Sequence, residues 1–313
     1  MSKQSGLRRS NRTGKHGFTI IELLVAVGVT ALLVSLMLGI VVNITKGWNR
    51  SSGNLESGNQ ARLVLDQISS DLQAAIMRRD TNVWLAAVVQ SSKPVDWTGT
   101  GANTFSLPAG STPKLEDYKF GPYGVWLGFF STVPGTNTAG TTLSAPRAVS
   151  YQILRLPVVS GSSEVRYQMF RSEVLPDLTF TAGYNLLSTN YTSGSNANNA
   201  PYSIRSPERS NVIANNVVDF GVRLYVSGTA TARFPTSSTD AFLATTDITK
   251  GTNLGYPSVV EVFVRILSVD GAQQLALFEN PPTGYTPSGT WWDIVEANSR
   301  VYTRRIEIKS SSL

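Results

Sequence analysis

Few side chains in this sequence are of the types that carry out nucleophilic or metal-assisted catalysis. Cysteine is absent, and the single histidine, His16, lies near the amino terminus. A chain with no further imidazole and no thiol has no His-based triad and none of the usual zinc motifs. An enzyme would therefore need paired carboxylates or a Ser–Lys arrangement. Because the acidic residues are scattered, we identify no catalytic residue and no cofactor site, and we predict that the protein is not an enzyme.

The pair Asp240 and Asp247 is a candidate for a cation site. Both lie in a stretch rich in Ser and Thr, and oxygen ligands of this kind suit calcium. Their spacing matches no recognised calcium loop, so we assign no metal ligand.

The residue in the most unusual setting is Glu22, which is the single charge in the apolar run from Phe18 to Val42. A helix of this run measures roughly 37 Å, enough to span the ~30 Å hydrocarbon layer with some tilt. A carboxylate at the centre of such a helix costs about 2.5–3.5 kcal/mol, and less near the end. In the first turn it meets the favourable end of the helix dipole, and Phe18 precedes it by four residues on the same face. Glu22 is therefore either a functional acid or a side chain that reaches to the membrane interface.

The positive charge of the chain is concentrated before this apolar run. The formal net charge is +6, from 27 Lys and Arg against 21 Asp and Glu, and most of the excess lies at residues 1–17 in Lys3, Arg8, Arg9, Arg12 and Lys15. The positive-inside rule then keeps residues 1–17 cytoplasmic and places the chain after Val42 across the membrane. The remainder is nearly neutral, which argues against nucleic acid as a partner.

The junction of the basic leader and the apolar run closely resembles the amino terminus of type IV prepilins. These have a basic leader that ends in glycine, then an aromatic residue, then a glutamate four residues later; here the residues are Lys15-His16-Gly17-Phe18-Thr19-Ile20-Ile21-Glu22. The resemblance implies that prepilin peptidase cuts between Gly17 and Phe18, that the Phe18 amine is methylated, and that Glu22 neutralises a neighbouring subunit's amine during filament assembly. An ordinary secretory signal has a shorter apolar run and a small-x-small cleavage site.

A stripe of small residues recurs every four positions in the apolar run. Ala31, Ser35 and Gly39 would let another helix approach closely. Apolar helices are rich in small residues in any case, so both interpretations stay open. Many major pilins carry proline at the position of Gly39.

The rest of the chain changes from a helical to a strand period. Residues 43–80 continue the helix as an amphipathic half, in which apolar residues at 3–4 spacing form one face: Ala61, Leu65, Ile68, Leu72 and Ile76. Residues 81–313 form an extracytoplasmic β-rich domain. Its expected strands are 83–89, 123–130, 147–156, 164–171, 218–226, 258–267 and 301–308, with a hairpin formed by 147–156 and 164–171. Long polar loops are expected at 98–114, 131–145, 181–210, 227–256 and 281–290. The predicted class is α+β and pilin-like, with a long helix packed on an antiparallel sheet.

Residues 60–80 and the late strands also resemble J-type minor pseudopilins of type II secretion, or a large cassette-encoded pseudopilin. The resemblance implies I- and K-type pseudopilins and an inner-membrane assembly platform as partners, in a periplasmic filament. One alternative is a membrane-anchored adhesin that uses an aromatic patch of Trp291, Trp292, Tyr285 and Tyr302. We expect burial of these tryptophans instead. A DNA-uptake component is a further alternative that the near-neutral charge disfavours.

Overall fold

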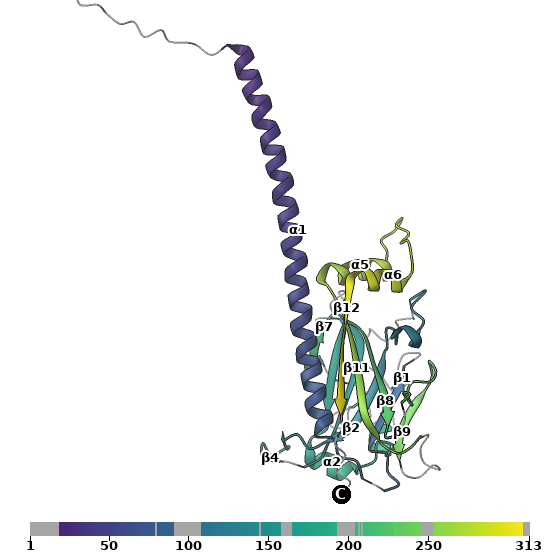
Figure 1. The fold of residues 1–313 in the computed structure, drawn as a ribbon. Coiled ribbons are helices and arrows are strands. Elements are labelled where there is room, and N and C mark those ends of the chain that lie inside the picture. Colours follow the sequence, from purple (N-terminus) through teal and green to yellow (C-terminus); the bar gives the residue numbers. More distant parts are fainter. Residues whose placement is uncertain are drawn as a thin grey trace, which may run out of the picture. The chain divides into compact units, whose positions relative to one another are not determined.

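The protein is α+β, as the sequence predicts, with one long helix and two main β-sheets (Figure 1). Two compact units divide the chain between Ser52 and Gly53. The helix α1 (Ile20–Gln73) contributes to both of them. The computed structural model describes residues 19–78, 80–90, 108–143, 145–157, 165–192, 204–205, 207, 209–228, 230–245 and 253–308.

The larger sheet has seven strands in the order β10-β9-β1-β2-β5-β6-β7. Neighbouring strands are antiparallel, except that β10 and β9 are parallel. The strands are β10 (Asn253–Leu254), β9 (Ala241–Thr245), β1 (Leu85–Val89), β2 (Val125–Ser131), β5 (Arg147–Pro157), β6 (Val165–Glu173) and β7 (Val212–Asn215).

The second sheet has three antiparallel strands in the order β12-β11-β8. They are β12 (Ser299–Glu307), β11 (Pro257–Leu267) and β8 (Val217–Val226). Short elements complete the fold: β3 (Gly135–Thr136), β4 (Thr142–Leu143), α2 (Pro176–Ala182), α3 (Thr189–Thr192), α5 (Val269–Glu279), α6 (Trp291–Asn298) and the 3₁₀ turns Leu115–Asp117 and Arg209–Asn211.

The second half of α1 packs into the main core together with both sheets. The predicted apolar face is confirmed, since Ala61, Leu65, Ile68 and Leu72 are all buried there. Apolar residues at 3–4 spacing lie on one side of a helix, so this apolar face can pack on strands while the polar face stays exposed to water.

The helix ends at Gln73, short of the predicted boundary at residue 80. After Gln73 the backbone pairs with the end of β2 instead of continuing the helix. Ala75 forms a bridge with Ser131, and the Ile76 N–H donates to the Phe130 carbonyl at 3.0 Å. Ile76, the last residue of the predicted apolar face, is therefore half-buried in extended chain. These sheet bonds satisfy the backbone groups that a longer helix would have paired internally.

The predicted strands are present, and β5 pairs with β6 as the predicted hairpin, from Val149 opposite Glu173 to Pro157 opposite Val165. The strands divide between two sheets, whereas the sequence pattern predicted one. Three of the predicted loops contain short elements: β3 and β4 lie in 131–145, α3 lies in 181–210, and β9 and β10 lie in 227–256. Helices α5 and α6 were not predicted; residues that begin them, Ser268 and Thr290, each accept a backbone hydrogen bond as an N-cap.

Candidate functional site: the exposed apolar helix and its acidic cap

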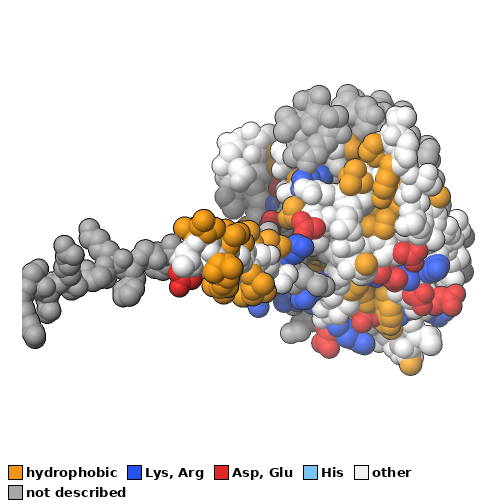
Figure 2. Space-filling view, turned by 90° about the horizontal axis from the view of Figure 1, so that it is seen from above, with side chains coloured by type: hydrophobic (Ala, Val, Ile, Leu, Met, Phe, Trp, Pro, Cys, Tyr) orange, Lys and Arg blue, Asp and Glu red, His pale blue; other side chains and the backbone are white. Residues whose placement is uncertain are grey.

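The first unit contains an apolar helical segment, Ile20–Trp48, that is long and apolar enough to cross a membrane. It has 29 residues, its most apolar 18-residue stretch has a mean hydropathy of 2.7, and none of the segment is buried. Its Leu, Ile and Val side chains are exposed around the helix, as the hydrophobic surface in Figure 2 shows. A helix that is apolar on all sides needs lipid or other helices around it. The candidate site is therefore a surface that contacts membrane or partner subunits.

Two threonine side chains of this segment bond within the helix. The Thr45 hydroxyl donates to the Val41 carbonyl at 2.8 Å, and the Thr30 hydroxyl donates to the Ala26 carbonyl. Hydroxyls that are satisfied by the carbonyl one turn earlier need no water. These two threonines are thus compatible with an apolar environment.

Glu22 and Thr19 form a reciprocal cap at the beginning of α1. The Glu22 N–H donates to Thr19 Oγ1 at 3.2 Å, and the Thr19 N–H donates to Glu22 Oε2 at 2.9 Å. The Thr19 hydroxyl lies 3.1 Å from the same carboxylate oxygen. This is a capping box, in which the first and fourth residues satisfy each other's free N–H groups.

The cap explains how Glu22 is held in the first turn. Both bonds to the carboxylate use Oε2, and the negative charge lies at the positive end of the helix dipole. Thr19 was not predicted as a cap, although the pattern Thr-x-x-Glu before an apolar run is a sequence signal for a capping box. Gly17 and Phe18, the predicted cleavage and methylation positions, lie outside the described residues, so the expected position of Phe18 on the face of Glu22 remains a prediction.

The small-residue stripe lies on an unbroken part of α1. Ala31, Ser35 and Gly39 are exposed, and a Cβ added to Gly39 would meet no atom within 4 Å. The helix continues through Gly39 without interruption. The helix thus has free space at Gly39 that another helix could occupy. The packing role of the stripe itself remains a prediction.

The chain is similar to a known family in this amino-terminal region. An exposed apolar helix with an acidic cap, followed by a β-rich unit, is the arrangement that the sequence predicted for a type IV pilin-like protein. Residues 12–38 match the family model of the prokaryotic N-terminal methylation motif, which confirms that prediction and implies processing by prepilin peptidase. The match does not specify a J-type pseudopilin. No curated protein and no solved structure matches the chain.

The tryptophans of the predicted aromatic patch are buried in the second unit. Trp291 is 0% exposed and Trp292 is 3% exposed, whereas Tyr285 is exposed and Tyr302 is half-buried. The expected burial of the two tryptophans is confirmed. They pack in a small cluster with Val218, Leu267, Leu275 and Val295.

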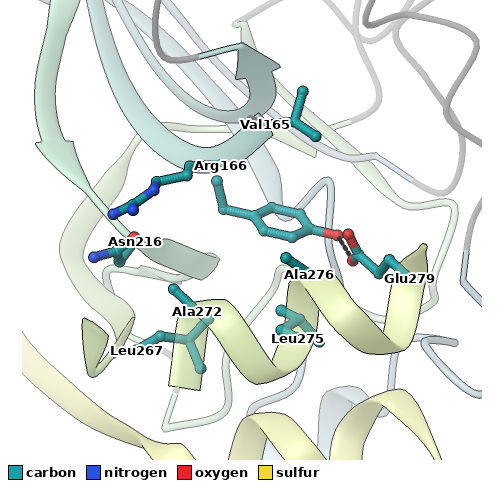
Figure 3. A pocket seen from close by; sticks show the side chains of 9 residues that line it. Val165, Arg166, Asn216, Leu267, Ala272, Leu275, Ala276 and Glu279 are labelled. Carbon is teal, nitrogen blue, oxygen red and sulfur yellow. Dashed lines mark hydrogen bonds between the residues drawn. The ribbon is translucent and has the colours of Figure 1, made fainter. Parts of the chain in front are cut away.

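A small cavity beside this cluster is lined by α5, β6 and Asn216 (Figure 3). Its volume of about 10 Å³ accommodates no more than a water molecule. At its wall the Glu279 carboxylate accepts from Tyr167 Oη at 2.5 Å, from Arg155 Nε at 2.7 Å and from Trp291 Nε1 at 3.0 Å. Burial and the neighbouring carboxylate raise the pKa of Tyr167 well above its usual value. The group fixes α5 to the sheet and leaves no room for an organic ligand.

The candidate cation site is only partly within the described chain. The Asp240 carboxylate accepts from the Thr236 N–H at 2.6 Å and from its hydroxyl at 2.8 Å. Asp247 lies outside the described residues. Elsewhere in the described part of the chain, no group of three or more acidic or His side chains could hold a metal ion.

Proposed function

We propose that this protein is a non-enzymatic minor pseudopilin, which is processed after Gly17 and joins a type II secretion or type IV pilus-like filament through α1. The observation that carries the proposal is the exposed apolar helix with a capped acid in its first turn. A water-soluble enzyme or binding protein would have to bury this surface, since exposed apolar area costs about 25 cal/mol per Å². A filament of similar helices within and above a membrane provides such burial.

The proposed topology is that of a single-pass inner-membrane protein. Residues 1–17 lie in the cytoplasm before cleavage, and the β-rich unit lies in the periplasm or outside the cell. The positive charges of the leader support this orientation. The proposed partners are I- and K-type-like pseudopilins, an inner-membrane assembly platform and prepilin peptidase.

The role of Glu22 tests the proposal directly. We expect Glu22→Ala to be cleaved as the wild type is, but to be recovered at a tenth or less of the wild-type amount in sheared filaments or cross-linked complexes. The physical reason is that an alanine cannot pair with a partner's amine in an apolar environment. Wild-type recovery of Glu22→Ala would reject the proposed role of the carboxylate.

The adhesin alternative receives less support, because its principal aromatic residues are in the core. Trp291 donates to Glu279 and is fully buried, so it has no face for a glycan. A glycan-binding assay of the wild type and Trp291→Ala would still distinguish the two functions. Specific binding that survives this substitution would require another surface.

A further inference from the structure

Strand β12 is the one long sheet edge that no other described element covers. At the edge of the larger sheet, the Asn215 N–H of β7 donates to Gln60 Oε1 of α1 at 3.2 Å. At the other edge of the smaller sheet, Leu224 of β8 forms backbone bonds with Arg233 and Phe234 at 2.8 and 3.1 Å. Strand β10 is only two residues long. In the described part of the chain, β12 pairs with β11 on one side and with no strand on the other.

The register identifies which backbone groups of β12 are free. Two bonds flank the pairing of β11 and β12: the Ile308 N–H donates to the Ser258 carbonyl, and the Ser268 N–H donates to the Asn298 carbonyl, both at 2.9 Å. Antiparallel pairs alternate between hydrogen-bonded and non-hydrogen-bonded, so even-numbered residues of β12 bond to β11. The N–H and C=O groups of the odd-numbered residues therefore point to the open side; these residues are Val301, Thr303, Arg305 and Glu307, and all four are exposed.

A polar groove of about 760 Å³ reaches β12 at Arg304 and Arg305. It lies between the second half of α1, the residues that follow β2, and β12, and its lining includes Asp66, Ser69, Ser70, Thr132, Arg304 and Arg305. Hydroxyl and guanidinium groups favour polar or charged side chains over apolar ones. An added strand would direct alternate side chains into this groove.

The charge of β12 selects the kind of segment that fits. The strand carries Arg300, Arg304 and Arg305 against a single acid, Glu307. Arg304 is paired with Asp66 at 2.5 Å, but 39% of its side chain remains exposed. A second copy of β12 would bring two sets of arginines to one edge, and opposed like charges destabilise strand pairs. An acidic strand would instead be attracted to the arginines of β12.

We propose that the free edge of β12 binds an extended acidic segment of a partner protein by strand addition. Main-chain bonds to Val301, Thr303 and Arg305 would supply affinity, and the arginines would supply selectivity for acidic side chains. The inference rests on the edge, the groove and the charges of the second unit, and it holds whether or not the protein is a pseudopilin.

The test uses the full mature chain in a non-ionic detergent and two fluorescein-labelled nine-residue peptides. One peptide alternates threonine and glutamate, and the other has lysine in place of glutamate. Fluorescence anisotropy at low salt should show at least tenfold tighter binding of the glutamate peptide. No measurable binding of that peptide, or equal binding of both, would overturn the proposal.

Three variants separate strand addition from general charge attraction. Thr303→Pro removes a free-edge N–H without removing a bond to β11, and should weaken binding of the glutamate peptide at least tenfold. Thr303→Val, its matched control, should bind within twofold of the wild type. The double variant Arg300→Glu, Arg305→Glu should prefer the lysine peptide, a gain that an unfolded protein cannot produce. Unchanged binding by Thr303→Pro, or a retained preference for glutamate in the double variant, would refute strand addition at this edge.

Discussion

The Asp71 carboxylate of α1 and the Arg171 guanidinium of β6 form a buried ion pair across the core. Arg171 Nε lies 2.7 Å from Asp71 Oδ2, and a second Arg171 nitrogen lies 3.3 Å from Oδ1. The Tyr151 hydroxyl donates to Oδ2 at 2.5 Å, and Asp71 is 0% exposed. Burial and the charge of Asp71 raise the pKa of Tyr151 well above its usual value. Because this pair needs several fixed partners, it sets the position of the end of α1 on the sheet.

Removal of one member of this pair should be strongly destabilising. We expect Arg171→Met to lower the free energy of unfolding by about 3–5 kcal/mol, because Asp71 is left as an unpaired buried charge. The double variant Asp71→Leu, Arg171→Met should recover much of that loss. Thermal unfolding monitored by near-UV circular dichroism measures both. A single variant as stable as the wild type would contradict the role of the pair.

Asp219 should make stability depend on pH. It is buried on β8, where burial raises its pKa to about 7 although Arg265 and the Phe120 N–H lower it. The folded state then binds more protons than the unfolded state between about pH 4 and pH 7, so the stabilising contribution of Asp219 falls as pH rises through this range. In the described part of the chain, the groups that face this carboxylate include Arg265, whose Nε lies 3.7 Å away, the Phe120 N–H, which donates at 3.1 Å, and the Gly121 N–H.

The variant Asp219→Asn isolates this effect. The melting temperature of the wild type relative to the variant should be highest near pH 4 and should fall steadily toward pH 8. Parallel pH profiles for the two proteins would show that Asp219 does not titrate in this range.

Gly221 on β8 should not accept a side chain. An added Cβ would lie 2.0 Å from two ring atoms of Phe120. Gly221→Ala should therefore destabilise the fold by about 1–3 kcal/mol, since overpacking forces the ring away. Gly58→Ala is a matched control: the new Cβ would meet only Tyr302 Oη at 3.8 Å, and alanine in a helix gains about 1 kcal/mol. Chemical denaturation should show a lower free energy of unfolding for Gly221→Ala than for the wild type, and a higher one for Gly58→Ala.

Much of the fold could be predicted because burial leaves a local pattern. The alternation of apolar and polar residues predicted strands β8 and β11, and apolar residues at 3–4 spacing predicted the buried face of α1. The division into two sheets could not be predicted this way, since period two says which face of a strand is buried but not which strand is its neighbour. Asp71 and Arg171 illustrate the same limit, because their pairing joins positions that are 100 residues apart.

Glu22 of the candidate site could be predicted because a single charge within an apolar run is itself a sequence signal. Glu22 is a single acid in an apolar run, so its importance was visible without a structure. Its partner Thr19 was missed, although the Thr-x-x-Glu spacing of a capping box was present in the sequence. The short helices α5 and α6 were missed because their caps, Ser268 and Thr290, are recognisable only once the flanking strands are placed.

Maturation should leave α1 in the protein. Mass spectrometry of the membrane-fraction protein should find a chain that begins at Phe18 and carries one methyl group on its amine. The reason is the match of residues 12–38 to the methylation motif, together with an apolar helix that continues to Trp48. A chain that begins near Met1, or one that is cut after Val42, would contradict this expectation and the proposed function with it.

The last prediction separates the two roles of the Glu22 carboxylate, as a helix cap and as a charge. Glu22→Gln retains an oxygen that can accept the Thr19 N–H, since glutamine also completes a capping box, but it removes the negative charge. Thr19→Val has the opposite effect: it keeps the charge and the Thr19-position N–H, and it removes the hydroxyl that accepts the Glu22 N–H. Loss of the hydroxyl cap should cost about 1 kcal/mol of local helix stability.

If charge neutralisation of a partner's amine drives assembly, Glu22→Gln should be recovered in cross-linked filaments at a tenth or less of the wild-type amount, while Thr19→Val should be recovered at close to that amount. Quantitative immunoblotting of cross-linked membranes measures both against processed protein. The reverse order, with Thr19→Val defective and Glu22→Gln normal, would show that the carboxylate acts only as a cap, because a neutral oxygen acceptor would then suffice.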